Sequence, residues 1–202
     1  MPSRLKAKSD KLLPTKGVRQ AGPPVRRRIY ARDLPLLDLR DLRISLIDDN
    51  EFATTLIKRL LSAMRVSQIF TCSDPTLAHD VIAKAKPDVV IVDLDMPEKE
   101  GLEIVRDIRR GRGTVAKDAS ILVVSAHTDR EHVGKARDEG ANWVLVKPLS
   151  FRSLYEGLVR VVLDDRPFVE EGNYVGPCRR VRTVAYDFSP DRRGADKKAE
   201  TI

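Results

Sequence analysis

The stretch Val89-Val90-Ile91-Val92-Asp93-Leu94-Asp95-Met96-Pro97, residues 89–97, decides the fold of this chain. It opens with an uninterrupted apolar run rich in β-branched side chains, which is typical of a strand buried on both faces of a parallel sheet. Two aspartates, Asp93 and Asp95, follow as soon as the run ends. The stretch therefore predicts a central strand that delivers carboxylates to one edge of a sheet.

Three other short apolar runs are followed by polar residues in the same way: 44–47 by Asp48-Asp49-Asn50, 121–124 by Ser125, and 144–146 by Lys147-Pro148. In open parallel α/β sheets the ligand site lies outside the carboxyl ends of the strands, where the strand order reverses. We therefore expect these polar side chains to meet at one edge of the sheet.

The segments between these runs have helical character. Phe52, Leu56, Leu60 and Met64 recur at fourfold spacing, which predicts an amphipathic helix. The predicted helices are 51–64, 75–85 after an N-cap at Asp74, 101–110, one from a cap at Thr128 or Asp129 to Gly140, and one from Ser150 to 163. The first predicted strand ends at Asp48. The other four span 68–72, 88–93, 120–125 and 143–146. Five such strand–helix units favour an α/β fold with a doubly wound, five-stranded parallel sheet.

The composition divides the 202-residue chain into one domain and two extensions. Residues 1–38 are rich in proline, glycine and arginine, so we expect a disordered basic N-terminal arm. Residues 39–165 form the predicted domain. Residues 166–202 are expected to form a flexible C-terminal tail in which the pattern Pro-x-Arg-Arg occurs twice, beginning at Pro177 and Pro190.

The charge is distributed unevenly between these parts. Residues 1–40 carry a net charge of +8, residues 41–165 a net of −3 and residues 166–202 a net of +2. The basicity therefore belongs mainly to the N-terminal arm, and the domain itself is mildly acidic. Such a distribution does not indicate a nucleic-acid-binding domain.

Membrane and disulfide signals are absent from the sequence. No apolar run approaches the roughly 20 residues needed to cross a bilayer, and the basic, polar start does not look like a secretory signal. The two cysteines, Cys72 and Cys178, are interpreted as reduced thiols. We expect a cytoplasmic protein without membrane insertion.

The residue types at the predicted edge suit phosphoryl chemistry. Carboxylates from the first and third strands offer the oxygen ligands that Mg²⁺ prefers, and the ion lets a carboxylate meet an anionic phosphoryl group. An aspartate in such a place can act as a nucleophile and form an acyl phosphate. The hydroxyl of Ser125 and the ammonium of Lys147 can hold the remaining phosphoryl oxygens.

In the identity and order of these residues, positions 42–163 resemble the receiver domain of two-component response regulators. The resemblance is to the stand-alone, chemotaxis-regulator-like type with a short basic C-terminal tail, and it implies a flavodoxin-like strand order 2-1-3-4-5. By resemblance, Asp93 is the phosphoacceptor, and Ser125 and Lys147 bind the phosphoryl group. The implied Mg²⁺ ligands are Asp48, Asp49, Asp93 and the backbone carbonyl of Asp95, with Asp49 preferred over Asp48 as a direct ligand.

The sequence departs from the family pattern at the position of the switch aromatic. Val144 stands where relatives carry a switch aromatic, and Trp143 is expected on the opposite face of its strand; we therefore expect a response through the loop and helix after Ser125. Asp95 and His127 flank the expected phosphoryl group. The three histidines of the chain are interpreted as surface or helix residues without metal-ligand spacing among them.

The resemblance implies a stand-alone response regulator that takes a phosphoryl group from a histidine kinase or histidine phosphotransfer protein and acts on an unknown protein target. It implies no enzyme beyond self-phosphotransfer and autodephosphorylation. Two alternatives stay open: a receiver-gated regulator whose basic arms contact nucleic acid, and a phosphate sink. Phosphorylation-dependent homodimerisation through the last two helices is also left open.

Overall fold

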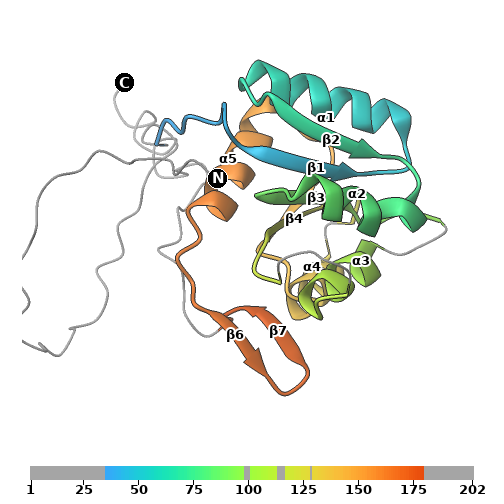
Figure 1. The fold of residues 1–202 in the computed structure, drawn as a ribbon, viewed down its shortest axis with the longest axis vertical. Coiled ribbons are helices and arrows are strands. Elements are labelled where there is room, and N and C mark those ends of the chain that lie inside the picture. Colours follow the sequence, from blue (N-terminus) through green and yellow to red (C-terminus); the bar gives the residue numbers. More distant parts are fainter. Residues whose placement is uncertain (1–34, 98–100, 113–116, 128, 180–202) are drawn as a thin grey trace, which may run out of the picture.

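The computed structural model describes residues 35–97, 101–112, 117–127 and 129–179. Five parallel strands form one sheet in the order β2-β1-β3-β4-β5, as Figure 1 shows. Their bounds are β1 Arg43–Ile47, β2 Gln68–Cys72, β3 Val89–Asp93, β4 Ser120–Ser125 and β5 Trp143–Val146. The predicted doubly wound sheet and its order 2-1-3-4-5 are confirmed.

The helices follow the predicted order: α1 Glu51–Ala63, α2 Ala78–Ala85, α3 Gly101–Arg109, α4 Arg130–Asp138 and α5 Phe151–Val162. Side-chain caps fix three of their starts, since Asn50, Asp129 and Ser150 accept hydrogen bonds from the first free N–H groups of α1, α4 and α5. The helix expected from Pro75 begins as a 3₁₀ turn, Pro75–Leu77, which Asp74 caps before α2 takes over.

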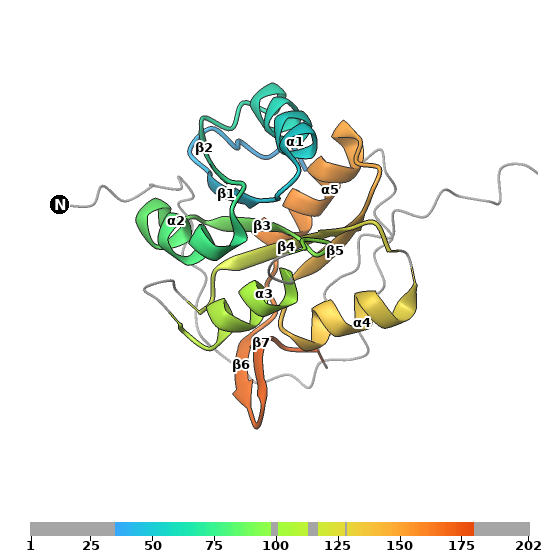
Figure 2. The same ribbon diagram turned by 90° about the vertical axis from the view of Figure 1, so that its right-hand side faces the viewer.

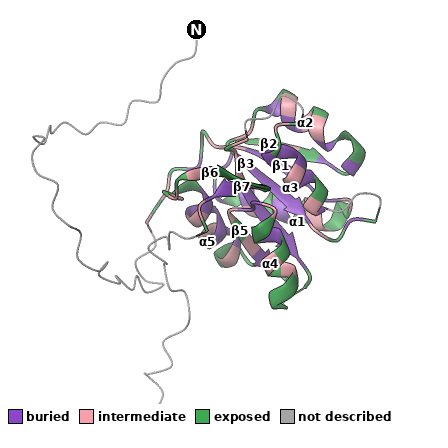
Figure 3. Cartoon of the chain, turned by 90° about the horizontal axis from the view of Figure 1, so that it is seen from below, coloured by how far each residue is buried: buried purple, intermediate pink, exposed green. Residues whose placement is uncertain are grey.

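Two apolar layers hold the sheet between helices, with α1 and α5 on one face and α2, α3 and α4 on the other (Figure 2). Viewed from below in Figure 3, the buried strands lie in the middle and exposed residues line the outer faces of the helices. The first layer joins the sheet residues Ile44, Leu46, Ile91 and Leu122 to Ile57, Leu61, Leu154 and Leu158 of the helices. The second joins Ile47, Val90, Val92 and Val123 to Ile82, Ile104, Ile108 and Ala136. Burial on both faces explains the apolar runs within the central strands β1, β3 and β4.

The segment before β1 packs on the domain. Leu39 is buried in the first layer, the hydroxyl of Tyr155 accepts a hydrogen bond from the N–H of Leu37 at 2.9 Å, and the same hydroxyl donates to the carbonyl of Pro35 at 2.8 Å. The arm predicted over residues 1–38 is therefore corrected at its end, because residues 35–38 belong to the domain. Residues 1–34 lie outside the described part.

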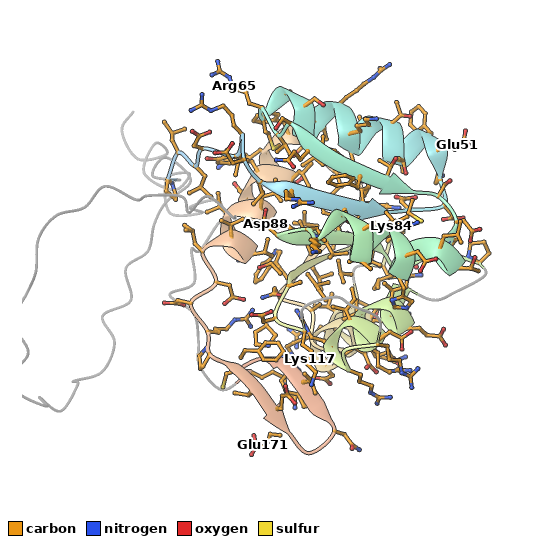
Figure 4. All side chains as sticks on the ribbon, in the orientation of Figure 1. Glu51, Arg65, Lys84, Asp88, Lys117 and Glu171 are labelled. Carbon is orange, nitrogen blue, oxygen red and sulfur yellow. The ribbon has the colours of Figure 1, made fainter. Side chains whose placement is uncertain are left out.

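The C-terminal tail predicted over residues 166–202 also needs correction. Within it, β6 Phe168–Glu171 and β7 Tyr174–Pro177 form an antiparallel hairpin beside the amino end of β4. Figure 4 labels Lys117 close to the hairpin, and its ammonium lies 3.3 Å from Glu170 Oε1. Residues 180–202, with the second Pro-x-Arg-Arg, lie outside the described part.

Arg109 explains why the hairpin docks there. This arginine is almost completely buried at the end of α3, and its guanidinium lies 5.6 Å from the centre of the Phe168 ring. Its Nε donates to the carbonyl of Gly140 at 2.8 Å. Gly140 has φ +99°, and a Cβ added there would collide with the carbonyl of Val175. The hairpin thus packs against the buried charge of Arg109 and against Gly140, which has no side chain to block it.

Candidate functional site

The carboxyl edge of the sheet gathers the predicted polar residues. Asp93 is the last residue of β3 and Ser125 the last of β4, while Asp48 and Lys147 directly follow β1 and β5. Asp48, Asp93 and Ser125 are buried. The backbone N–H of Lys147 donates to the carbonyl of Ser125 at 2.8 Å, which ties the ends of β4 and β5 together.

An ion pair between the buried Asp93 and the partly exposed Lys147 lies at the centre of this edge. The ammonium of Lys147 donates to Asp93 Oδ2 at 2.8 Å and lies 3.6 Å from Asp48 Oδ2. Burial by itself lowers the pKa of Lys147, but the hydrogen bond and charge of Asp93, together with the charge of Asp48, raise it above its usual value. Lys147 is therefore a permanent cation that reaches the predicted phosphoacceptor.

Asp48 lacks a full set of partners. Its Oδ1 accepts the N–H of Asn50 at 2.9 Å, whereas Oδ2 is buried without a hydrogen-bond partner in the described part of the chain. Burial, and then the charge of Asp93, raise the pKa of Asp48. The ammonium of Lys147, 3.6 Å away, is too far to donate a hydrogen bond to this oxygen, so a metal cation at the site would give it a closer partner.

The neighbouring carboxylates fit a magnesium ion. Ligand oxygens of Asp48, Asp49 and Asp93 lie within 4.8 Å of one another, and Asp49 is half-buried at the rim. Three carboxylates, one of them with an unpartnered oxygen, form the kind of partial cage that Mg²⁺ takes while it keeps water ligands. The part expected of the Asp95 backbone carbonyl stays a prediction.

Gly101 lets α3 start directly against this site. A Cβ added at Gly101 would collide with the backbone carbonyl of Asp93. Only glycine therefore permits α3 to approach the end of β3 so closely.

The side chain of Asp95 links the segments that follow β3 and β4. Its Oδ2 accepts the N–H of Ala126 at 2.9 Å, and its Oδ1 lies 3.2 Å from His127 Nε2. The N–H of His127 in turn donates to Ser125 Oγ at 3.0 Å. Asp95 and His127, the two residues expected to flank the phosphoryl group, thus contact each other.

His127 lies on the surface and His132 in α4, as interpreted, but the expected absence of metal-ligand spacing is wrong for these two histidines. The rings of His127 and His132 stack with centroids 4.4 Å apart, and His132 Nδ1 lies 2.7 Å from Asp129 Oδ2. The turn into α4 brings these residues together. The spacing His-x-Asp-x-x-His around a helix N-cap was the signal that could have found this cluster.

Trp143 and Val144 lie on opposite faces of β5, as expected. Trp143 is partly exposed beside α5, where the guanidinium of Arg160 lies 4.0 Å from its ring centre. Val144 packs on the other face, against the layer formed with α2, α3 and α4. No aromatic therefore stands at the family's switch position on that face.

A doubly wound sheet that carries an acidic cluster, a lysine and a serine at its carboxyl edge defines the class of response regulator receiver domains. Comparison with known families agrees: residues 44–158 match the model of the response regulator receiver domain. The chain belongs to this family.

The curated relatives include regulators of different output. The transcriptional regulatory protein KdpE of Staphylococcus aureus is 32% identical over 120 residues, and the match covers 59% of this chain and 49% of that protein. The chemotaxis protein CheY-3 of Vibrio cholerae is 25% identical over 122 residues, covering 60% of this chain and 92% of that protein. The shared part is thus the receiver domain.

Solved structures give the same fold. The Vibrio cholerae chemotaxis protein CheY4 superposes with a TM-score of 0.55 at 28% identity, covering 59% of this chain and 98% of that one. The receiver domain of the sensor histidine kinase PA1611 from Pseudomonas aeruginosa, at 21% identity and a TM-score of 0.54, covers 60% of this chain and 97% of that domain; its structure has a magnesium ion in the active site cleft. Among the helices described here, none has the length and apolar content to cross a membrane.

Proposed function

We propose that this chain is a response regulator, which takes a phosphoryl group onto Asp93 from a histidine kinase or a histidine phosphotransfer protein. The observation that carries the proposal is the ion pair of the buried Asp93 with Lys147, 2.8 Å apart, beside an oxygen of Asp48 that has no hydrogen-bond partner in the described part. Its output is phosphorylation-dependent contact with a protein target, and its chemistry is limited to self-phosphotransfer and autodephosphorylation.

The reaction needs one nucleophile and several groups that bind charge. A carboxylate oxygen of Asp93 forms a bond to phosphorus while the bond between phosphorus and the donor's histidine nitrogen breaks, and that nitrogen takes up a proton. The ammonium of Lys147 is close enough to move from Asp93 onto a phosphoryl oxygen. Ser125 Oγ lies at the end of the neighbouring strand, where a rotation would let its O–H donate to the same group.

Mg²⁺ is the cofactor in this proposal, held by Asp48, Asp49, Asp93 and the backbone carbonyl of Asp95. When bound, the ion would neutralise charge shared by the carboxylates and the incoming phosphoryl group. The unpartnered oxygen of Asp48 supports this assignment.

Exposed apolar side chains support a protein as the phosphodonor. Phe52 is 81% exposed in the first turn of α1, Leu56 is exposed one turn further, and Phe151 is exposed at the start of α5. Both helices follow the carboxyl ends of their strands, β1 and β5, so their first turns lie at the same edge of the sheet as Asp93. Large apolar groups left in water near a reactive site fit a partner protein that covers them.

The test is phosphorylation by acetyl phosphate, followed by intact mass or Phos-tag electrophoresis with and without Mg²⁺. Wild type should gain one phosphoryl group only with Mg²⁺, and Asp93→Asn should gain none although the two side chains are nearly isosteric. Asp95→Asn serves as the matched control, because it also removes a carboxylate near the site but leaves the nucleophile Asp93. Phosphorylation of Asp93→Asn at the wild-type rate would disprove the assignment.

A further inference from the structure

The cluster of His127, Asp129 and His132 lies outside the acidic site, at the junction of β4 and α4. Their ligand atoms lie within 4.8 Å of one another. The side chains are 51%, 50% and 41% exposed, respectively, so an ion from solvent can reach all three. Two imidazoles and one carboxylate are a ligand set that borderline divalent metals select, whereas Mg²⁺ prefers oxygen alone.

Asp129 is held as a carboxylate by the helix that it caps. Its Oδ1 accepts the N–H groups of Glu131 and His132 at 3.1 and 3.0 Å. A fixed anion therefore stands 2.7 Å from His132 Nδ1 at neutral pH.

His127 is oriented by a second carboxylate. Its Nε2 lies 3.2 Å from Asp95 Oδ1, and the other oxygen of Asp95 is fixed by the N–H of Ala126. A carboxylate beside one ring nitrogen favours the tautomer with its proton there, which leaves the lone pair of the other ring nitrogen for a ligand. This carboxylate–histidine arrangement is typical of the groups that orient metal-binding histidines.

We propose that His127, Asp129 and His132 bind a divalent transition-metal ion of the Zn²⁺ class, with water as the remaining ligand. Asp95 acts as a positioning residue that orients His127. The ligand atoms must rearrange to reach zinc–ligand distances of about 2.0–2.2 Å. Rotation of the two imidazole rings supplies that movement while Asp129 stays the cap of α4.

Such an ion would act on the phosphorylation site through Ser125. The N–H of His127 donates to Ser125 Oγ, and the ion would fasten His127 to the first turn of α4. The hydroxyl would then be held where it accepts this N–H, away from a phosphoryl group on Asp93. This consequence rests on the proposed function, and it predicts slower phosphorylation when the ion is bound.

The site is tested by titrating the full chain with Zn²⁺ in a calorimeter, with excess Mg²⁺ present to occupy the acidic cluster. His132→Gln should weaken Zn²⁺ binding by about 100-fold and Asp95→Asn by about tenfold. His79→Gln is the matched control, because it removes the one histidine outside the cluster. Cys178→Ser should also bind like wild type. Equal affinity of wild type and His132→Gln, or no binding by wild type, would overturn the proposal.

The kinetic consequence is measured separately, as the rate of phosphorylation by acetyl phosphate with and without Zn²⁺. Zn²⁺ should slow wild type severalfold and leave His132→Gln unchanged. A Zn²⁺ effect of equal size in both proteins would overturn the coupling to Ser125. A wild type that binds Zn²⁺ but takes up no phosphoryl group would instead contradict the proposed function, since the binding measurement does not depend on phosphorylation.

Discussion

The two ends of the sheet treat buried charge in opposite ways. At the carboxyl edge, two buried aspartates share the single ammonium of Lys147, and one oxygen of Asp48 has no hydrogen-bond partner in the described part. At the amino end, the buried guanidinium of Arg109 donates to the carbonyls of Gly140, Lys117 and Ala119 and to Asn142 Oδ1. One edge is left short of positive charge, as a cation-binding site requires, and the other is satisfied, as a structural joint requires.

The largest effect on stability is therefore expected at the amino end. Arg109→Met removes four hydrogen bonds and leaves buried carbonyls without donors, so we expect a loss of about 3 kcal/mol or more in the free energy of unfolding. Urea unfolding measures it. Arg110→Met is the matched control, since Arg110 is exposed at the next position and its loss should change stability by less than about 0.5 kcal/mol.

The same substitution leaves the carboxyl edge intact. Folded Arg109→Met should accept a phosphoryl group from acetyl phosphate at the wild-type rate, because no contact of Asp93 or Lys147 involves the hairpin in the described part. A loss of stability no larger than that of Arg110→Met would remove the distinction between the two ends.

The contrast also explains what the sequence could predict. Asp48, Asp93 and Lys147 each follow an apolar run, so the period of a strand and the edge rule of parallel sheets place them together without further information. Arg109 has no such local signal. A basic residue in the last turn of a helix is ordinarily a surface residue that faces the helix dipole, and its burial depends on the hairpin almost sixty residues later.

The hairpin and the histidine cluster were missed for related reasons. Gly172, Gly176 and Pro177 in and beside the two strands are typical of loops, and the strands gain stability only from docking on the domain. His127 and His132 meet because Asp129 starts α4 between them, so their contact depends on where a helix begins. Boundaries of helices are the least certain part of a sequence-based prediction.

The ionisation of the buried Asp48 should make the stability of the domain depend on pH. Because burial raises its pKa in the folded state, its contribution to stability is greatest below the unfolded pKa of roughly 3.9 and falls as the pH rises toward the higher folded pKa. Asp48→Asn removes this pH-dependent loss of stability, because the amide does not ionise. Without Mg²⁺, the variant should be more stable than wild type near pH 7 by about 1 kcal/mol, and the difference should shrink as the pH falls toward 4.

Magnesium should reverse the order. An ion that binds only the folded state stabilises wild type by about 1.4 kcal/mol at ten times its dissociation constant, whereas Asp48→Asn loses one of the carboxylates. Thermal unfolding with and without Mg²⁺ measures both effects. If Asp48→Asn proved less stable than wild type in the absence of Mg²⁺, the unpartnered carboxylate would be a structural group like Arg109.

The smallest effect is expected at the exposed end of the hairpin. Arg179 Nη1 lies 2.7 Å from Asp138 Oδ1, and its guanidinium stacks 4.0 Å from the ring centre of Tyr174. Both contacts are open to solvent, so Arg179→Gln should cost only about 0.5–1 kcal/mol, and less at high salt. A double-mutant cycle with Asp138→Asn isolates the ion pair. If Arg179→Gln lowered the free energy of unfolding as much as Arg109→Met, surface ion pairs would hold the hairpin on the domain. A small, salt-dependent loss would instead show that the hairpin is held mainly by the buried guanidinium of Arg109, which lies against Phe168.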